Sequence, residues 1–260
     1  MENSLPAPPA DGEGLWRPLR GEFRAAMAIL VATVAVELGL FFVSRAAGVG
    51  LREAAAAMLM AGAVWIALTA PVLAASAPNL LRSLVRAGLT ADATLLSLLI
   101  MWACWNYSSS AQERMSLISV FEVYCTCVAL AVGGAFAVRG PVSQRGRLSV
   151  AVVVSALMFL GLASAFWSSG LIAATKGQTQ LDVVALAVWL NPLYSITSAM
   201  VDPLHYVIQQ EAVMYQITFI GDYAPAPLCP WYAATAIYLP LGVVLMAAGR
   251  FVSRRAKLRS

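Results

Sequence analysis

The feature that most constrains this chain is a series of long apolar runs, separated by short segments that hold most of its charged residues. Six of these runs are about 20 residues long, the length that an α-helix needs to cross the hydrocarbon core of a bilayer. Charged residues make up only 12% of the 260 residues, whereas they make up about a quarter of soluble domains. The sequence therefore predicts an all-α, polytopic membrane protein with six transmembrane helices.

The boundaries of the predicted segments follow from these runs. Residues 1–20 are rich in proline, glycine and acids and are expected to form a disordered cytoplasmic lead, while residues 21–260 form one transmembrane domain. A short amphipathic helix is expected from Ala77 to Gly88. The six spans are expected at about 25–43, 54–75, 90–107, 115–138, 148–174 and 231–249.

The distribution of positive charge predicts the orientation of the spans. With the N-terminus inside, the cytoplasmic segments hold 13 of the 17 Lys and Arg residues, and the outer segments hold Arg45, Arg52, Arg114 and Lys176. Cytoplasmic loops of membrane proteins carry such an excess. A seventh span would place the basic C-terminal segment outside. We therefore predict six spans in the cell (plasma or inner) membrane, with both termini in the cytoplasm.

One further apolar segment, at about 181–213, is predicted not to cross the membrane. Its first 21 residues contain Asn191 and Pro192, and a proline disfavours helix at the residue before it. The segment should therefore split into two half-helices. Irregular backbone is tolerated at membrane depth where protein or water satisfies it. A broken, re-entrant outer segment is expected between the fifth and sixth spans, and a surface helix at the interface is the alternative.

Two acidic residues, Glu37 and Glu122, lie within or near predicted spans. A charged side chain at the centre of a membrane helix costs about 2.5 to 3.5 kcal/mol, so acids at such positions are functional candidates. A structural role is the alternative for both. Glu37 could pair with Arg45 or Arg52 at the outer end of its span, and Glu122 could pair with Arg114.

The sequence contains none of the motifs that bind a catalytic metal or a nucleotide. A membrane metalloprotease needs two histidines one helical turn apart, and this chain has one histidine, His205. No GxSxG elbow and no Gly-rich loop ending in Gly-Lys-Ser/Thr occur, so we expect no cofactor on this chain, and any ATP would bind a partner subunit. Nucleic acid is not an expected partner, because the basic residues do not cluster on one soluble face.

The second half of the chain resembles the permease subunits of ABC transporters of the ABC-2 exporter type. The matching stretches are "SQRGRLSVAVVVSALMFLG" (143–161), "WLNPLYSITSAMVDP" (189–203) and "PWYAATAIYLPLGVVLMAAGRFVSRR" (230–255), of which "LNPLY" is the most specific. The first half departs from this pattern, because the segment after the second span lacks the acidic E-x-x-x-G-T sequence of the family.

The resemblance implies an ATP-driven exporter that needs several subunits. The chain would form the translocation pathway with a second permease subunit in contact with membrane lipid, and a separate ATP-binding cassette subunit would drive it. The implied outer gate is formed by Asn191, Pro192, Tyr194, Asp202 and Pro203. The implied surface for coupling to the ATPase is formed by Trp16, Arg20, Arg24, Arg82 and Arg86.

Two other classes of function remain open at the level of sequence. One is a polytopic membrane enzyme that acts on lipid, with Asp202, His205 and Glu211 at the outer face. The other is a structural subunit of a membrane complex, or a carrier of another type.

Overall fold

The computed structural model describes residues 13–108, 115–140, 143–199 and 230–259, and in these ranges all regular structure is α-helical. The helices are α1 (Glu13–Ala46), α2 (Leu51–Ser76), α3 (Leu80–Ser108), α4 (Leu117–Val138), α5 (Gln144–Leu162), α6 (Ser164–Ala174), α7 (Gln178–Leu190), α8 (Pro192–Ala199) and α11 (Ala233–Arg259). Six of them, α1 to α5 and α11, are long and apolar enough to span a membrane. The predicted all-α fold with six candidate spans is confirmed.

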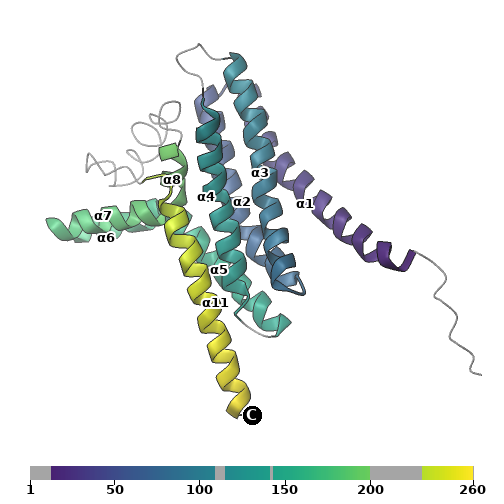
Figure 1. Cartoon of the computed structure of the whole chain (residues 1–260). Helices are drawn as coiled ribbons and strands as arrows, with labels where there is room; N and C mark the ends of the chain where they lie inside the picture. Colours follow the sequence, from purple (N-terminus) through teal and green to yellow (C-terminus); the bar gives the residue numbers. More distant parts are fainter. Residues whose placement is uncertain (1–12, 109–114, 141–142, 200–229, 260) are drawn as a thin grey trace, which may run out of the picture.

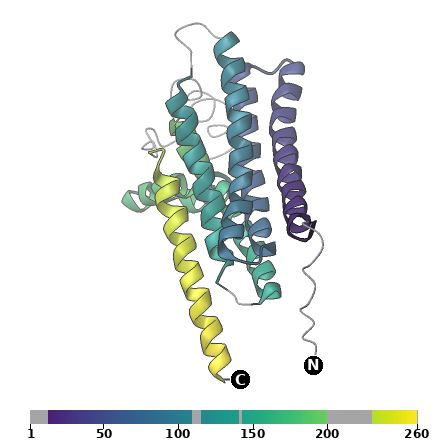
Figure 2. The same cartoon turned by 45° about the vertical axis from the view of Figure 1, so that its right-hand side comes forward.

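The bundle is centred on α2, α3 and α4. Helix α1 packs against α2 and α3, α5 packs against α2, and α11 packs along α4 on the other side (Figure 1). The first turns of α1 and the last turns of α11 lie at the same end of the bundle, together with the α2–α3 and α4–α5 connections (Figure 2). We call this end the basic end, because it carries Arg24, Arg82, Arg139, Arg147 and Arg250.

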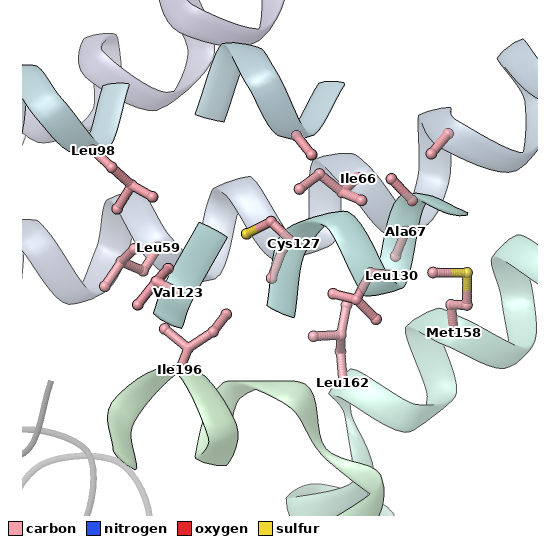
Figure 3. Close-up of a cluster of buried hydrophobic side chains, with 14 of the residues drawn as sticks. Leu59, Ile66, Ala67, Leu98, Val123, Cys127, Leu130, Met158, Leu162 and Ile196 are labelled. Carbon is pink, nitrogen blue, oxygen red and sulfur yellow. The ribbon is translucent and has the colours of Figure 1, made fainter. Parts of the chain in front are cut away.

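Small side chains allow the central helices to approach one another closely. The buried face of α2 is built largely from alanines, among them Ala63, Ala67 and Ala70. Small residues favour helix association in lipid, where the hydrophobic effect between helices is absent. Larger apolar side chains fill the remaining space, and Figure 3 shows Ile196 of α8 directed into this core near Val123 of α4.

The third span begins earlier than predicted. Helix α3 is continuous from Leu80, so the expected separate helix at Ala77–Gly88 is instead the first part of α3, and Ala77 is the C-cap of α2. Polar residues at the start of α3 are compatible with a helix because the Ser83 hydroxyl donates to the Ala74 carbonyl oxygen of α2 at 2.8 Å, and the Thr90 hydroxyl donates to the Ala87 carbonyl oxygen at 2.7 Å.

The fifth span ends earlier than the predicted 148–174. Helix α5 stops at Leu162, and the remaining residues form α6, which turns away at Ala163 and pairs with α7. With 11 residues, α6 is too short to cross a bilayer.

The sixth predicted span, 231–249, is extended at its C-terminal end, because α11 continues to Arg259. The remaining boundaries agree with the predictions within a few residues, except at the N-terminal end. Helix α1 begins at Glu13, so residues 13–20, which were expected to belong to the disordered lead, are helical. Residues 1–12 lie outside the described part of the chain.

Candidate functional site

Besides the turn between α6 and α7, the described part of the segment between the fifth and sixth spans has two breaks. The first break, at Ala163, separates α5 from α6, and the second, at Asn191, separates α7 from α8. Helices α6 and α7 are joined through Gly177, whose φ of 61° lies in the left-handed region that glycine adopts without strain. The α6–α7 pair extends sideways from the bundle, and α8 packs along α4 (Figure 1).

Asn191 connects both breaks through its side chain. It is 0% exposed, its Nδ2 donates to the carbonyl oxygen of Leu162 at 3.0 Å, and its Oδ1 accepts from the backbone N–H of Leu193 at 3.0 Å. The first bond satisfies a carbonyl at the end of α5, and the second caps the N-terminus of α8. Pro192 follows as the first residue of α8, a position where a helix needs no backbone donor.

Other side chains satisfy further backbone groups near the breaks. The Ser164 hydroxyl donates to the Ala187 carbonyl oxygen at 2.8 Å, and the Tyr238 hydroxyl of α11 donates to the Leu190 carbonyl oxygen at 2.7 Å. The Ser195 hydroxyl accepts from the backbone N–H of Ala234 at 3.1 Å. Irregular backbone at membrane depth requires such internal partners. The predicted split at Asn191 and Pro192 is confirmed.

The three described residues of the expected outer gate are buried. Asn191, Pro192 and Tyr194 pack inside the chain, and burial raises the pKa of the Tyr194 phenol. The two hydrogen bonds of Asn191 hold the broken segment in place. Asp202 and Pro203 lie outside the described residues, as do His205 and Glu211 of the alternative lipid enzyme.

At the basic end, Arg139 binds the connection between α2 and α3. It is 9% exposed, and its Nη2 donates to the carbonyl oxygens of Ala77, at 2.7 Å, and of Asn79. Its Nε donates to the Ser83 hydroxyl, which itself donates to a carbonyl of α2. A guanidinium group can do this because it offers five donors in a fixed plane. Arg139, the C-cap of α4, therefore fixes the position of the α2–α3 turn.

Two further arginines approach Arg139. Arg147 of α5 donates from Nη1 to the Ala77 carbonyl oxygen at 3.0 Å, and Arg250 lies on α11. Burial, followed by the charges of Arg147 and Arg250, holds the pKa of Arg139 below its usual value. The Nε of Arg147 is buried and has no hydrogen-bond partner. Three guanidinium groups therefore gather where α4, α5 and α11 meet the α2–α3 turn.

The described part of the expected coupling surface lies at this same end. Arg24 and Arg82 are exposed on α1 and α3, and Arg86 donates to the Ser76 hydroxyl at 3.0 Å. Trp16 and Arg20 lie in α1, but their side chains are outside the described part. The sequence did not identify Arg139 as a site residue. An arginine that directly follows an apolar run gives the same sequence pattern whether its side chain is buried or exposed.

Replacing Arg139 by lysine should lower the free energy of unfolding by about 3 kcal/mol. A lysine keeps the charge, but its single ammonium group cannot reach all the acceptors that the guanidinium group contacts. Some buried carbonyl oxygens therefore lose their donors. SDS titration in mixed micelles measures this loss. Arg145→Lys, at an exposed position on α5, is the matched control and should leave stability unchanged. Equal stability of the two variants would contradict the role assigned to Arg139.

Glu37 lies in the centre of the bundle, facing α2 and α3. It is 1% exposed, and its Oε1 accepts from the Thr94 hydroxyl at 2.6 Å, while its Oε2 is buried without a hydrogen-bond partner. A Cβ added to Gly62 of α2 would come within 2.7 Å of Oε1, so a larger residue there would require the Glu37 carboxylate to shift. A polar contact between α1 and α3, beside Gly62 of α2, therefore lies inside the membrane-spanning part of the fold.

The expected pairing of Glu37 with Arg45 is wrong. Arg45 donates instead to the Val49 carbonyl oxygen at 2.7 Å, and Glu37 is directed away from that end, toward Thr94. The side chain of Arg52 is outside the described part. Glu122 is half-buried in the second turn of α4, and its expected partner Arg114 lies outside the described residues.

Replacing Glu37 by glutamine should change the free energy of unfolding by less than about 1 kcal/mol. The amide oxygen can still accept from Thr94, and the side chain keeps its volume. Glu37→Ala should cost about 2 to 4 kcal/mol, since it leaves a cavity and removes the acceptor. SDS titration of both variants, with the exposed Glu53→Ala as a control, measures the difference. A Glu37→Ala variant as stable as Glu37→Gln would contradict an anchoring role.

Among the described residues, no three His, Cys, Asp or Glu side chains come together as a group that could hold a metal ion. Three polar sites of the described bundle are the break at Asn191, the group of Arg139, Arg147 and Arg250, which we call the arginine cluster, and Glu37 with Thr94. In comparisons with family models, with curated proteins and with solved structures, nothing matches this chain.

Proposed function

We propose that this chain is the membrane-spanning permease subunit of an ATP-driven exporter of the ABC-2 type. The observation that carries the proposal is the broken segment between the fifth and sixth spans, whose "LNPLY" stretch contains the break and the buried Asn191 that holds it. Two such chains form the translocation pathway, and a separate subunit binds ATP. Both termini lie in the cytoplasm, and the protein resides in the cell membrane.

The arrangement of the two ends supports different roles for them, with coupling to the ATPase at the basic end and gating at the broken segment. At the basic end, Arg139 joins the α2–α3 turn to α4 through hydrogen bonds. A displacement of this turn by a bound subunit is therefore transmitted to α4, at the centre of the bundle. At the other side of the fold, α8 packs against α4 and α2. The ATP-binding subunit acts on the basic end, at Arg24, Arg82 and Arg86, and the broken segment changes position at the exit.

Co-purification tests this function directly. The tagged full-length chain, extracted from its native membrane in mild detergent, should bring with it a polypeptide that carries a Gly-rich phosphate loop, and the complex should show vanadate-sensitive ATP hydrolysis. The double variant Arg82→Glu, Arg86→Glu should lose this partner while it remains inserted, because both charges are reversed at the contact. Lys176→Glu, at the α6–α7 turn, is the matched control and should keep it. A chain that purifies without any ATPase after cross-linking contradicts the proposal.

A further inference from the structure

An apolar cleft opens between α5 and α11, with α4 as its floor. Its volume is about 330 Å³, which falls within the range of small-molecule sites. The lining includes Ala137 of α4, Val154 and Leu157 of α5, and Leu241 and Leu245 of α11. The hydroxyl of Tyr238, which also lines the cleft, is already bonded to the Leu190 carbonyl oxygen. The cleft therefore offers an occupant apolar contacts along the membrane-spanning length of these helices.

The cleft ends at the arginine cluster of the basic end. Arg139 follows Ala137 by two residues, and Arg250 follows Leu245 by five, which is about 7.5 Å along a helix. Arg147 precedes Val154 by about two turns on α5. The buried Nε of Arg147, which has no hydrogen-bond partner, adds an unused donor at this place.

No described carboxylate balances these three charges. The acidic residues whose side chains the structure describes are Glu37, Glu53, Asp92, Glu122 and Asp182. Glu53 and Glu122 lie in the first two turns of α2 and α4, at the opposite end of the bundle. Glu37, Asp92 and Asp182 lie on α1, α3 and α7, away from the last turns of α4 and α11. Among the described side chains, the cluster thus has an excess of positive charge beside an apolar cleft, which matches a ligand with an anionic head and an apolar tail.

We propose that this cleft binds an anionic phospholipid, with an acyl chain between α5 and α11 and its phosphate at Arg147 and Arg250. Basic pockets between membrane helices bind anionic head groups in this way. A second copy of the chain fits less well, because a two-fold contact through this face would bring the arginines of both copies together, and like charges across an interface are costly. The site depends on the bundle alone and is independent of the proposed export function.

Lipid titration of the purified protein in neutral detergent tests this site. Phosphatidylglycerol should bind more tightly than phosphatidylcholine with the same acyl chains, as counted by native mass spectrometry. The double variant Arg147→Gln, Arg250→Gln should bind phosphatidylglycerol about 30-fold more weakly, since each arginine near a membrane surface attracts anionic lipid. Arg254→Gln, one turn beyond Arg250 on α11, is the control and should bind normally. Unchanged affinity in the double variant would overturn the assignment.

A second variant tests the cleft without changing any charge. Leu157 lines the cleft and is 56% exposed, so Leu157→Trp should fill the cleft without disturbing the core, and phosphatidylglycerol binding should fall at least tenfold. Glycerol phosphate, which has the head group but no acyl chain, should not compete. Competition by glycerol phosphate would show a phosphate site only. A Leu157→Trp variant that changes from dimer to monomer with unaltered lipid binding would show that the cleft is an interface between copies. Either result would overturn the lipid assignment.

Discussion

Replacement of Asn191 by alanine is expected to lower the free energy of unfolding by about 2 to 4 kcal/mol and to abolish the proposed export activity, while the chain still inserts into the membrane. The alanine removes the N-cap of α8, which is worth about 1 kcal/mol. It also leaves the carbonyl oxygen of Leu162 buried without its donor, at a cost of about 1 to 3 kcal/mol. Both breaks of the segment lose the side chain that joins them.

Two further variants separate these contributions. Asn191→Asp keeps the acceptor for Leu193 but replaces the donor to Leu162 with a second oxygen, so it should be no more stable than Asn191→Ala. Asn79→Ala removes the cap of α3, where Asn79 Oδ1 accepts from the backbone N–H of Arg82 at 2.8 Å on an exposed turn. It should cost only about 1 kcal/mol. Unfolding by SDS and substrate efflux from vesicles are the readouts. Normal efflux by Asn191→Ala would contradict the role of the broken segment in transport.

Replacement of Gly242 by alanine is expected to separate α11 from α4 and to lower stability by about 3 kcal/mol, the upper end of the usual cost of overpacking. A Cβ at Gly242 would collide with the backbone carbonyl of Gly133, and a Cβ at Gly133 would come within 2.5 Å of the Tyr238 carbonyl oxygen. Backbone atoms on both sides cannot rotate away as a side chain can, so one helix has to move.

Gly39→Ala is the matched control for this variant. Gly39 lies in a membrane-spanning helix as Gly242 does, but a Cβ there would meet no atom within 4 Å. Its stability should be unchanged or slightly higher, because alanine is the better helix former. The fraction of monodisperse protein after extraction, together with SDS titration, measures both variants. If Gly242→Ala were as stable as Gly39→Ala, the close contact of α4 with α11 would not hold the sixth span.

The number of spans and the break at Asn191 could be predicted because both depend on local chemistry. An apolar run of about 20 residues needs no partner to be recognised, and Pro192 restricts the residue before it wherever the segment lies. The second break could not be predicted in this way. Residues 148–174 are apolar throughout, and the turn at Ala163 depends on the bond from Ser164 to the carbonyl of Ala187, 23 residues away.

The partners of the charged residues could not be predicted from the sequence either, because they lie far away along the chain. Arg139 binds carbonyls about 60 residues earlier in the chain, and nothing in its own neighbourhood distinguishes it from the exposed Arg145. Glu37 was placed near an arginine because local spacing allowed it, whereas its partner lies on a helix that had been expected to begin ten residues later than it does. Burial of these side chains is a property of the assembled bundle.

The contact between Glu37 and Thr94 also sets an order of events during synthesis. The two residues are 57 positions apart, so at about 5 to 20 residues per second the ribosome adds Thr94 roughly 3 to 11 seconds after Glu37. Helix α1 is therefore synthesised several seconds before the part of α3 that will receive its acid. During this interval the carboxyl group needs water or the insertion machinery beside it, and α1 can settle against its neighbours only when α3 arrives.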